Sequence, residues 1–326
     1  MNVAFCINRL ALAGFGPTLT SLIRNCSKTE ELSIWILCTD FLISDQNSIN
    51  ELLTEENFKG KHTYIEFDAK KEFGKFSSLH GDWTTYGRLL LPDLLSEESS
   101  VLYLDADLIV ELDVLSLKDF DFENKGLAAV SGSTLKYALD HPFLINRLDL
   151  SLESKYFNCG ILLFNLDMWR KENYKKQCLD IADKYPQELV SHDQTLLNAV
   201  FNSNFSLLPS HFNCPWSADK FRPAVAEKMI MHYIGSPKPW DLAGKFMHSG
   251  YATWKEYLTK RWQSKYVKVD LNSFKRVWKI QRSYVRVINK KFKSRLSNKK
   301  TIEVKLLIPE ITIPQNTDIP AIPIEA

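Results

Sequence analysis

The chain contains 326 residues, of which 45% are hydrophobic, 25% charged and 12% aromatic. This composition is ordinary for a globular enzyme, and the length suits one large α/β domain or two modest ones. No apolar run approaches the roughly 20 residues of a membrane-spanning helix, and no basic leader precedes the first apolar run, so we expect neither a spanning helix nor a signal peptide. The net charge of +2 conceals a basic segment, because residues 255–300 hold 16 Lys and Arg against two acids.

The cysteine pattern argues for free thiols. No two cysteines are spaced as Cys-x-x-Cys, and none pairs closely with a His at a metal-ligand spacing. We therefore expect buried, reduced thiols of a cytosolic protein. The six residues are Cys6, Cys26, Cys38, Cys159, Cys178 and Cys214.

Alternating apolar runs and helix-like stretches organise the first part of the chain. Apolar runs predict strands at residues 2–7, 33–38, 63–67, 101–105, 127–131 and 160–165. Helical spacing of apolar residues predicts helices at residues 16–26, 45–57, 84–91, 167–176, 177–184 and 192–201. Strand-helix alternation predicts an α/β fold with a mostly parallel, doubly wound sheet, which binds ligands at the carboxyl ends of its strands. Residues 202–250 read as a long irregular stretch.

Asp105 and Asp107 follow the strand predicted at residues 101–105. In extended backbone their side chains share one face, where two carboxylates repel unless a cation lies between them. A divalent cation with oxygen ligands is the simplest candidate. The competing interpretation is a strand end that enters a turn, where Asp is favoured by hydrogen bonds to the backbone.

Several further motifs occur in a specific order along the chain. They are Tyr86-Gly87-Arg88, Asp105-Ala106-Asp107, Phe157-Asn158-Cys159-Gly160 with Asn165-Leu166-Asp167-Met168-Trp169, His192-Asp193-Gln194 with Asn198, and His232-x-x-Gly235-x-x-Lys238-Pro239-Trp240. With these motifs, residues 1–255 resemble glycosyltransferase family 8, the retaining enzymes related to bacterial lipopolysaccharide galactosyltransferases and to glycogenin. The resemblance implies a single Rossmann-like nucleotide-sugar-binding domain of the GT-A type.

The resemblance implies a metal site made of Asp105, Asp107 and His232. Two carboxylates and one imidazole suit Mn²⁺ better than Ca²⁺, with Mg²⁺ as the alternative. The ion would bridge the phosphates of a UDP-sugar and neutralise charge on the departing UDP. Lys238 resembles the family's phosphate-contacting lysine, and Gly235 would let the backbone approach the diphosphate closely.

Other matching positions would hold the donor. Arg88 and Asp193 look like the residues that bind the sugar hydroxyls, Asn158 lies near the same ring, and Gln194 lies close to the anomeric carbon. These four residues form the implied catalytic set, although a surface ion pair for Arg88 and a helix N-cap for Asp193 are the plain alternatives. The implied UDP-sugar contacts are Ile7, Asn8, Tyr86, Ala106, Asp105, Gly235 and Lys238.

Some positions depart from the family pattern. Asn8 stands where members often have an Asp near the uracil and ribose, and an amide can still bond uracil. Ser131-Gly132-Ser133 replaces an acidic residue that some galactosyltransferases place near the acceptor, while His80 aligns with a histidine near the acceptor in some relatives. Retention of configuration at the anomeric carbon leaves two routes for sugar transfer open, double displacement and same-face attack. Our hypothesis is same-face attack, with Gln194 stabilising the oxocarbenium-like state.

The basic segment interleaves aromatic residues with its cations, which favours binding to an anionic lipid surface. A solvated helix is the main alternative, and nucleic acid is not expected because no nucleic-acid module accompanies the segment. We therefore predict a catalytic domain at residues 1–255, a membrane-association segment at 256–300 and an extended or disordered tail at 301–326. The expected location is the cytoplasmic face of the inner membrane, with peripheral attachment.

Together these observations predict transfer of galactose or glucose from a UDP-sugar to a saccharide or glycolipid acceptor, in lipopolysaccharide or lipooligosaccharide core synthesis. Two alternatives stay open. Asp105-Ala106-Asp107 also resembles the nucleophile motif of haloacid-dehalogenase-like phosphatases, although that motif normally follows the first strand of its domain. A catalytically degenerate sugar-binding protein is the other alternative.

Overall fold

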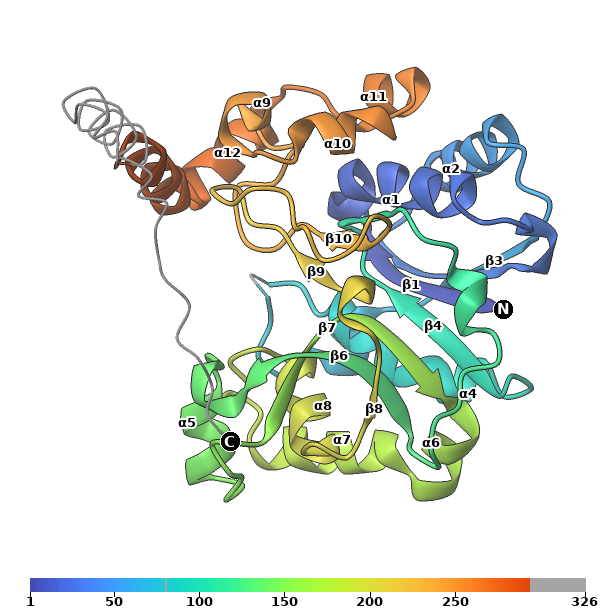
Figure 1. The fold of residues 1–326 in the computed structure, drawn as a ribbon, viewed down its shortest axis with the longest axis vertical. Helices are drawn as coiled ribbons and strands as arrows, with labels where there is room; N and C mark the ends of the chain where they lie inside the picture. The colour runs from blue at the N-terminus through green and yellow to red at the C-terminus, as the bar shows by residue number, and fades with distance from the viewer. Residues whose placement is uncertain (80, 294–326) are drawn as a thin grey trace, which may run out of the picture.

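A computed structural model describes residues 1–79 and 81–293. In this part of the chain seven strands form one sheet in the order β3-β2-β1-β4-β7-β6-β8, and three short strands form a second sheet, β5-β10-β9 (Figure 1). The strands are β1 (Asn2–Asn8), β2 (Ser33–Thr39), β3 (Lys61–Glu66), β4 (Ser100–Leu104), β5 (Leu108–Val110), β6 (Leu127–Thr134), β7 (Lys155–Asn165), β8 (Ser206–Leu207), β9 (Cys214–Pro215) and β10 (Ile230–His232).

The large sheet is mixed and mostly parallel, as predicted. β3, β2, β1 and β4 run parallel, whereas β7 is antiparallel to β4 and β6. Each predicted strand overlaps an observed one. The buried apolar runs of β1 and β4 form the middle of the sheet, so their carboxyl ends meet at one edge beneath the polar motifs.

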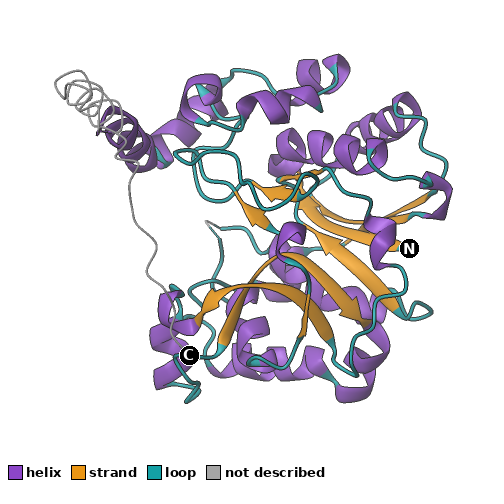
Figure 2. Cartoon of the chain, viewed as in Figure 1, coloured by secondary structure: helices purple, strands orange, loops and turns teal. Residues whose placement is uncertain are grey.

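Helices cover both faces of the sheet, which makes a three-layer α/β fold (Figures 1 and 2). α1 and α2 cover one face, and α6, α7 and α8 cover the other. The helices are α1 (Leu12–Arg24), α2 (Ile43–Glu55), α3 (Ala69–Phe73), α4 (Leu91–Leu94), α5 (His141–Asn146), α6 (Leu166–Glu172), α7 (Tyr174–Lys184), α8 (Asp193–Phe201), α9 (Gly244–Met247), α10 (Tyr251–Glu256), α11 (Lys260–Tyr266) and α12 (Leu271–Lys279).

Several predicted boundaries are wrong, each for a local reason. Residues 84–91 form a 3-10 helix (Thr84–Leu90) that runs into α4. Pro92 lies in the first turn of α4, where N–H groups have no partner within the helix, so the N–H that proline lacks is not needed. α6 and α7 separate at Asn173, which adopts left-handed backbone with φ of 57°. The stretch predicted as irregular, residues 202–250, contains β8, β9, β10 and α9.

The basic segment is divided between the core and the surface. α11 packs against α1, and its Trp262 belongs to the main hydrophobic core with an indole N–H that donates to the Leu12 carbonyl at 2.8 Å. α12 ends at Lys279, and residues 281–293 are again helical, so the helical structure is interrupted at Ile280. No helix within the described ranges is long and apolar enough to cross a membrane.

Some predictions fall outside the described residues, namely those for His80, residues 294–300 and the tail at 301–326. The predicted domain boundary at residue 255 stays a prediction, although Trp262 shows that chain beyond it contributes to the core. All six cysteines are free, and five of them are buried while Cys26 is partly exposed.

Replacing Trp262 tests whether this part of the basic segment is structural. Its indole is 3% exposed and lies so close to Gly16 that a Cβ there would be 2.3 Å from the indole nitrogen. We expect Trp262→Ala to lower the free energy of unfolding by about 3–5 kcal/mol, measured by urea denaturation.

Trp278 provides the matched control, because it is 75% exposed. Trp278→Ala should change the free energy of unfolding by less than about 0.5 kcal/mol. Equal effects of the two substitutions would contradict the assignment of Trp262 to the core.

Candidate metal and donor site

The site begins where β4 ends. The Asp105 N–H donates to the Gly160 carbonyl of β7 at 2.8 Å, which holds the end of β4 in the sheet. The chain then bends at residues 106–107 and leaves the large sheet as β5. The extended backbone that we predicted for the two acids is therefore wrong, since a bend carries them to the junction between the two sheets.

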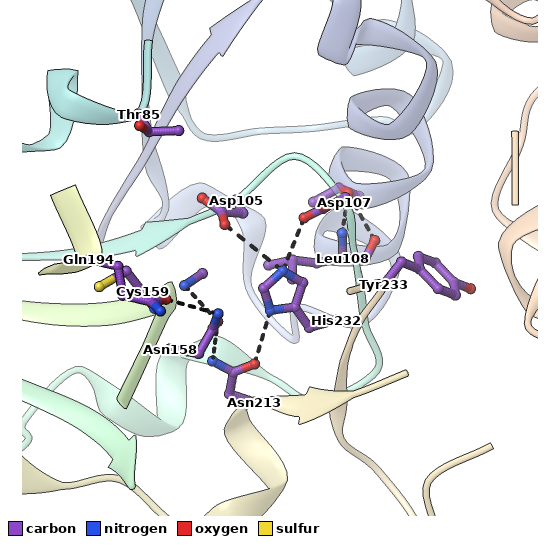
Figure 3. A network of polar contacts seen from close by, with 12 residues as sticks. Thr85, Asp105, Asp107, Leu108, Asn158, Cys159, Gln194, Asn213, His232 and Tyr233 are labelled. Carbon is purple, nitrogen blue, oxygen red and sulfur yellow. Dashed lines mark hydrogen bonds and ion pairs between the residues drawn. The ribbon is translucent and has the colours of Figure 1, made fainter. Parts of the chain in front are cut away.

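The pairing of β5 with β10 brings His232 to the two acids. The strands are antiparallel with Leu108 opposite His232, and the Tyr233 N–H donates to the Asp107 carbonyl at 3.0 Å. As a result, ligand atoms of Asp105, Asp107 and His232 all lie within 4.8 Å of one another (Figure 3). The structure thus unites the three predicted ligands from distant parts of the chain.

Each carboxylate has one oxygen held by the protein and one that faces the imidazole. Asp105 Oδ1 accepts from the Tyr103 hydroxyl at 2.7 Å and from Arg88 at 3.2 Å, while its Oδ2 lies 3.9 Å from His232 Nε2. Asp107 Oδ2 accepts from Lys238 Nζ at 2.7 Å, while its Oδ1 lies 3.2 Å from the same Nε2. One oxygen of each acid is therefore directed at the same point.

Asn213 orients the imidazole and was missed by the sequence reasoning. Its Oδ1 lies 3.2 Å from His232 Nδ1. Because an amide oxygen only accepts, this contact assigns the proton to Nδ1 and leaves the Nε2 lone pair facing the carboxylates. Such support fixes the tautomer and the ring orientation of a metal ligand. Asn213 lies in the stretch predicted as irregular, where no periodic pattern marks it.

The three residues fit a divalent cation. The buried Asp107 Oδ1 accepts no hydrogen bond, which leaves it available to a ligand. A Cβ at Gly160 would lie 2.2 Å from His232 Cε1 and 3.0 Å from Asp105 Oδ2, so the missing side chain keeps the space open. Burial opposes ionisation of Asp107, but the adjacent ammonium group of Lys238 holds the pKa of that carboxyl below its ordinary value. Two ionised oxygen donors and one imidazole nitrogen suit a first-row divalent metal.

Arg88 is buried and does not form the surface ion pair that was the plain alternative. Its side chain is 2% exposed, with Nη2 3.2 Å from Asp105 Oδ1 and Nε 3.0 Å from Asp193 Oδ2. The guanidinium also donates to the Cys159 carbonyl and lies 4.1 Å from the centre of the Tyr103 ring. Arg88 thus holds a predicted metal-ligand carboxylate and a predicted sugar-binding carboxylate in fixed positions.

α8 carries two further catalytic candidates, Asp193 and Gln194, and packs them against β7. Asp193 is the first residue of α8, and the Asn198 side chain ties the helix to β7 by accepting from the Phe157 N–H and donating to the Phe157 carbonyl, both at 3.0 Å. Gln194 Oε1 accepts from Asn158 Nδ2 at 3.1 Å and from the Cys159 N–H at 3.0 Å. Asn158 in turn accepts from Asn213 at 3.3 Å, so these amides connect Gln194 with the imidazole (Figure 3).

The nucleotide contacts predicted from the resemblance stay predictions. The side chains of Ile7 and Tyr86 are buried, so they support the edge of the sheet. The Asn8 amide is engaged internally, with Oδ1 accepting from the Ala11 N–H and Nδ2 donating to Asp82 at 2.6 Å. Ala106 lies in the bend between the two acids, and Gly235 has a φ of +68°, which explains the need for glycine there.

Comparison with known proteins agrees with this geometry. A family model described as glycosyl transferase family 8 matches residues 2–243. The chain belongs to that family. Its fold matches the crystal structure of galactosyltransferase LgtC in complex with donor and acceptor sugar analogs, at a TM-score of 0.68 and 22% identity over 81% of this chain and 100% of that one. The predicted GT-A type fold is confirmed.

Curated relatives include two enzymes of lipopolysaccharide synthesis. Lipopolysaccharide 1,3-galactosyltransferase of Salmonella typhimurium is 27% identical over 77% of this chain and 76% of its own length. Lipopolysaccharide 1,2-glucosyltransferase of Escherichia coli is 27% identical over 73% of each chain. The family match, and the position of Asp105 after the fourth strand, argue against the phosphatase alternative.

Asn213 offers a test of the metal site that does not depend on turnover. We expect Asn213→Ala to weaken Mn²⁺ binding by about 10- to 100-fold, because the imidazole loses the partner that fixes its tautomer. The dissociation constant is measured by isothermal titration calorimetry in the presence of UDP. Asn146→Ala, at an exposed asparagine of α5, should leave the constant unchanged. Wild-type affinity in Asn213→Ala would show that Asn213 does not orient a metal ligand.

Proposed function

We propose that this protein is a retaining hexosyltransferase that moves galactose or glucose from a UDP-sugar to a saccharide acceptor. The observation that carries the proposal is the convergence of Asp105, Asp107 and His232, with Lys238 beside them. When bound there, Mn²⁺ or Mg²⁺ would neutralise the charge that develops on the departing UDP. Lys238 adds a positive charge next to the diphosphate position.

The other side chains divide the work of holding the donor. The Asp193 carboxylate, which pairs with Arg88, would accept hydrogen bonds from sugar hydroxyls. Asn158 lies nearby on β7. Gln194 presents an amide oxygen to the space next to Asn158, where it can stabilise positive charge at the anomeric carbon. Such a site supports same-face attack, in which the leaving phosphate accepts the proton of the acceptor hydroxyl.

A donor panel tests this activity. Purified protein is incubated with UDP-galactose, UDP-glucose and UDP-N-acetylglucosamine, with Mn²⁺, with Mg²⁺ or with EDTA, and released UDP is measured. We expect release from one of the two hexose donors and a loss of at least about 100-fold in EDTA or in Asp107→Asn, because the departing diphosphate loses its counter-charge.

Asp149→Asn is the matched control, because Asp149 is exposed and lies after α5 rather than at the site. Metal-independent release, or full activity of Asp107→Asn, would contradict the proposal. A covalent sugar adduct on Gln194→Glu, detected by intact mass, would favour double displacement over same-face attack.

We further propose that the C-terminal helices bind an anionic lipid surface on the cytoplasmic side, where a glycolipid acceptor of the lipopolysaccharide core would be presented. Leu271, Phe274 and Trp278 are exposed at i, i+3 and i+7 on α12. The helical residues 281–293 repeat this spacing with another exposed apolar row. That row is Val285, Ile288 and Phe292. Exposed cations beside these rows complement anionic headgroups.

The opposite faces of these helices contact the catalytic domain. Arg276 pairs with the buried Asp241, Tyr284 donates to the Leu242 carbonyl, and Lys290 pairs with Asp219 at 2.7 Å. The apolar rows therefore face away from the domain. Truncation at residue 258 is a poor test of lipid binding, because it would remove Trp262 from the core, whereas substitutions on the exposed rows leave the core intact.

Vesicle sedimentation tests lipid binding. Wild-type protein should bind vesicles of phosphatidylglycerol and phosphatidylcholine but not of phosphatidylcholine alone. Lys275→Gln with Lys279→Gln should weaken binding by about 2 kcal/mol, and Phe274→Ser with Trp278→Ser should weaken it further by removing buried apolar area. Tyr137→Ser, at an exposed aromatic residue elsewhere, is the control. Unchanged binding of both double variants would remove the lipid proposal.

A further inference from the structure

The buried carboxyl group of Asp140 lies near the side-chain amide of Gln194, and Asp140 belongs to none of the motifs above. Asp140 precedes α5 and is 0% exposed. Its Oδ2 accepts from the Tyr156 hydroxyl at 3.2 Å and from the Thr195 hydroxyl at 2.8 Å, whereas its Oδ1 has no hydrogen-bond partner. A buried carboxyl group is costly unless it is partnered, so its position next to α8 calls for an explanation.

The Tyr156 hydroxyl connects Asp140 with Gln194 through two hydrogen bonds. Burial, and then the charge of Asp140, raise the pKa of Tyr156 far above its ordinary value, so the hydroxyl keeps its proton. That single proton is donated to Asp140, so the hydroxyl oxygen can only accept from its other neighbour. The neighbour is Gln194 Nε2, at 2.7 Å. The hydrogen bond between Tyr156 and Asp140 therefore requires that the nitrogen of the Gln194 amide, and not its oxygen, faces Tyr156.

The oxygen end of Gln194 is selected from the other side. Oε1 accepts from Asn158 Nδ2 and from the Cys159 N–H, as described above. Two donors on one side and an obligate acceptor on the other determine which way the amide lies, where a free glutamine would adopt either orientation. The carbonyl oxygen consequently faces Asn158 and Cys159, which precede Gly160 and the metal ligands beside it, whereas the nitrogen faces Tyr156 near the start of the same strand.

We propose that Asp140 and Tyr156 are positioning residues that keep the carbonyl oxygen of Gln194 directed at the donor sugar. This inference rests on the proposed function, because it concerns the sugar-transfer step. A carbonyl oxygen stabilises positive charge that develops at the anomeric carbon, whereas a flipped amide would direct N–H groups at the same atom and oppose that charge. Thr195, the residue after Gln194, contributes the second hydrogen bond that fixes Asp140.

Removing the Tyr156 hydroxyl tests the proposal. In Tyr156→Phe the Gln194 nitrogen loses its acceptor and the amide is free to turn. We expect kcat for sugar transfer to fall on the order of 10- to 100-fold. The KM for the UDP-sugar and the Mn²⁺ dissociation constant should stay within about twofold, because neither the metal ligands nor Lys238 change.

Two further variants provide a control for the loss of a tyrosine hydroxyl and an independent test of Asp140. Tyr64→Phe removes a tyrosine hydroxyl that also makes two hydrogen bonds, to the Gln46 carbonyl and to Asn50, but on β3, and it should keep the wild-type kcat. Asp140→Leu keeps the approximate volume of the side chain but removes the acceptor of the Tyr156 hydroxyl, which frees the hydroxyl proton to turn toward Gln194. This variant should lose kcat as Tyr156→Phe does, with kcat taken per folded molecule from an unfolding curve.

A double-mutant cycle decides whether Tyr156 acts through Gln194. If it does, Tyr156→Phe should cause no further loss in a Gln194→Ala background. Multiplying losses in the double variant, or a wild-type kcat for Tyr156→Phe beside an impaired Gln194→Ala, would overturn the positioning role and leave the proposed function standing. Full activity of Gln194→Ala would overturn both the positioning role and the part that Gln194 plays in the proposed transfer.

Discussion

The antiparallel pairing of β5 with β10 is the constraint on which the site depends. It places His232 opposite Leu108, one residue from Asp107, and so joins a histidine from a late loop to the end of β4. The other edge of β5 is satisfied by α1, where the Thr18 hydroxyl accepts from the Leu108 N–H and the Ser21 hydroxyl accepts from the Val110 N–H. With both edges bonded, a strand of three residues holds the candidate metal ligands in place.

Electrostatic balance explains the residues around that strand. Asp105, Asp107 and Asp193 would repel one another if they stood alone at the carboxyl edge of the sheet. Arg88 lies between the first and the third, and Lys238 lies against the second. Arg88 contacts Asp105 through Oδ1 and Lys238 contacts Asp107 through Oδ2, so the protein neutralises part of the charge while the oxygens that face His232 stay available. A cation bound to those oxygens completes the balance.

How much of this site the sequence predicts depends on how far apart in the sequence the interacting residues lie. Long apolar runs mark β1 and β4, and Asp105 and Asp107, which follow β4, were correctly placed at the carboxyl end of that strand. β10 has only three residues, and no periodicity distinguishes it from a loop. Asn213 and Asp140 act through hydrogen bonds to residues far away in the chain, a kind of information that local pattern does not carry. The motif around His232 came from family resemblance rather than from spacing alone.

The C-terminal helices illustrate the same point and connect the site with the exposed basic surface. A charge run predicts an interaction surface, but it does not reveal that Arg276 is directed inward to Asp241. Asp241 also accepts the Lys238 N–H at 2.7 Å, and Lys238 contacts Asp107, so the inner face of α12 braces the loop that supports a metal ligand. Because that face is occupied, only the row that contains Trp278 is available for a partner. Because Arg276 and the apolar row lie on opposite faces of α12, the contact with Asp241 leaves the row exposed, and both faces can be used at the same time.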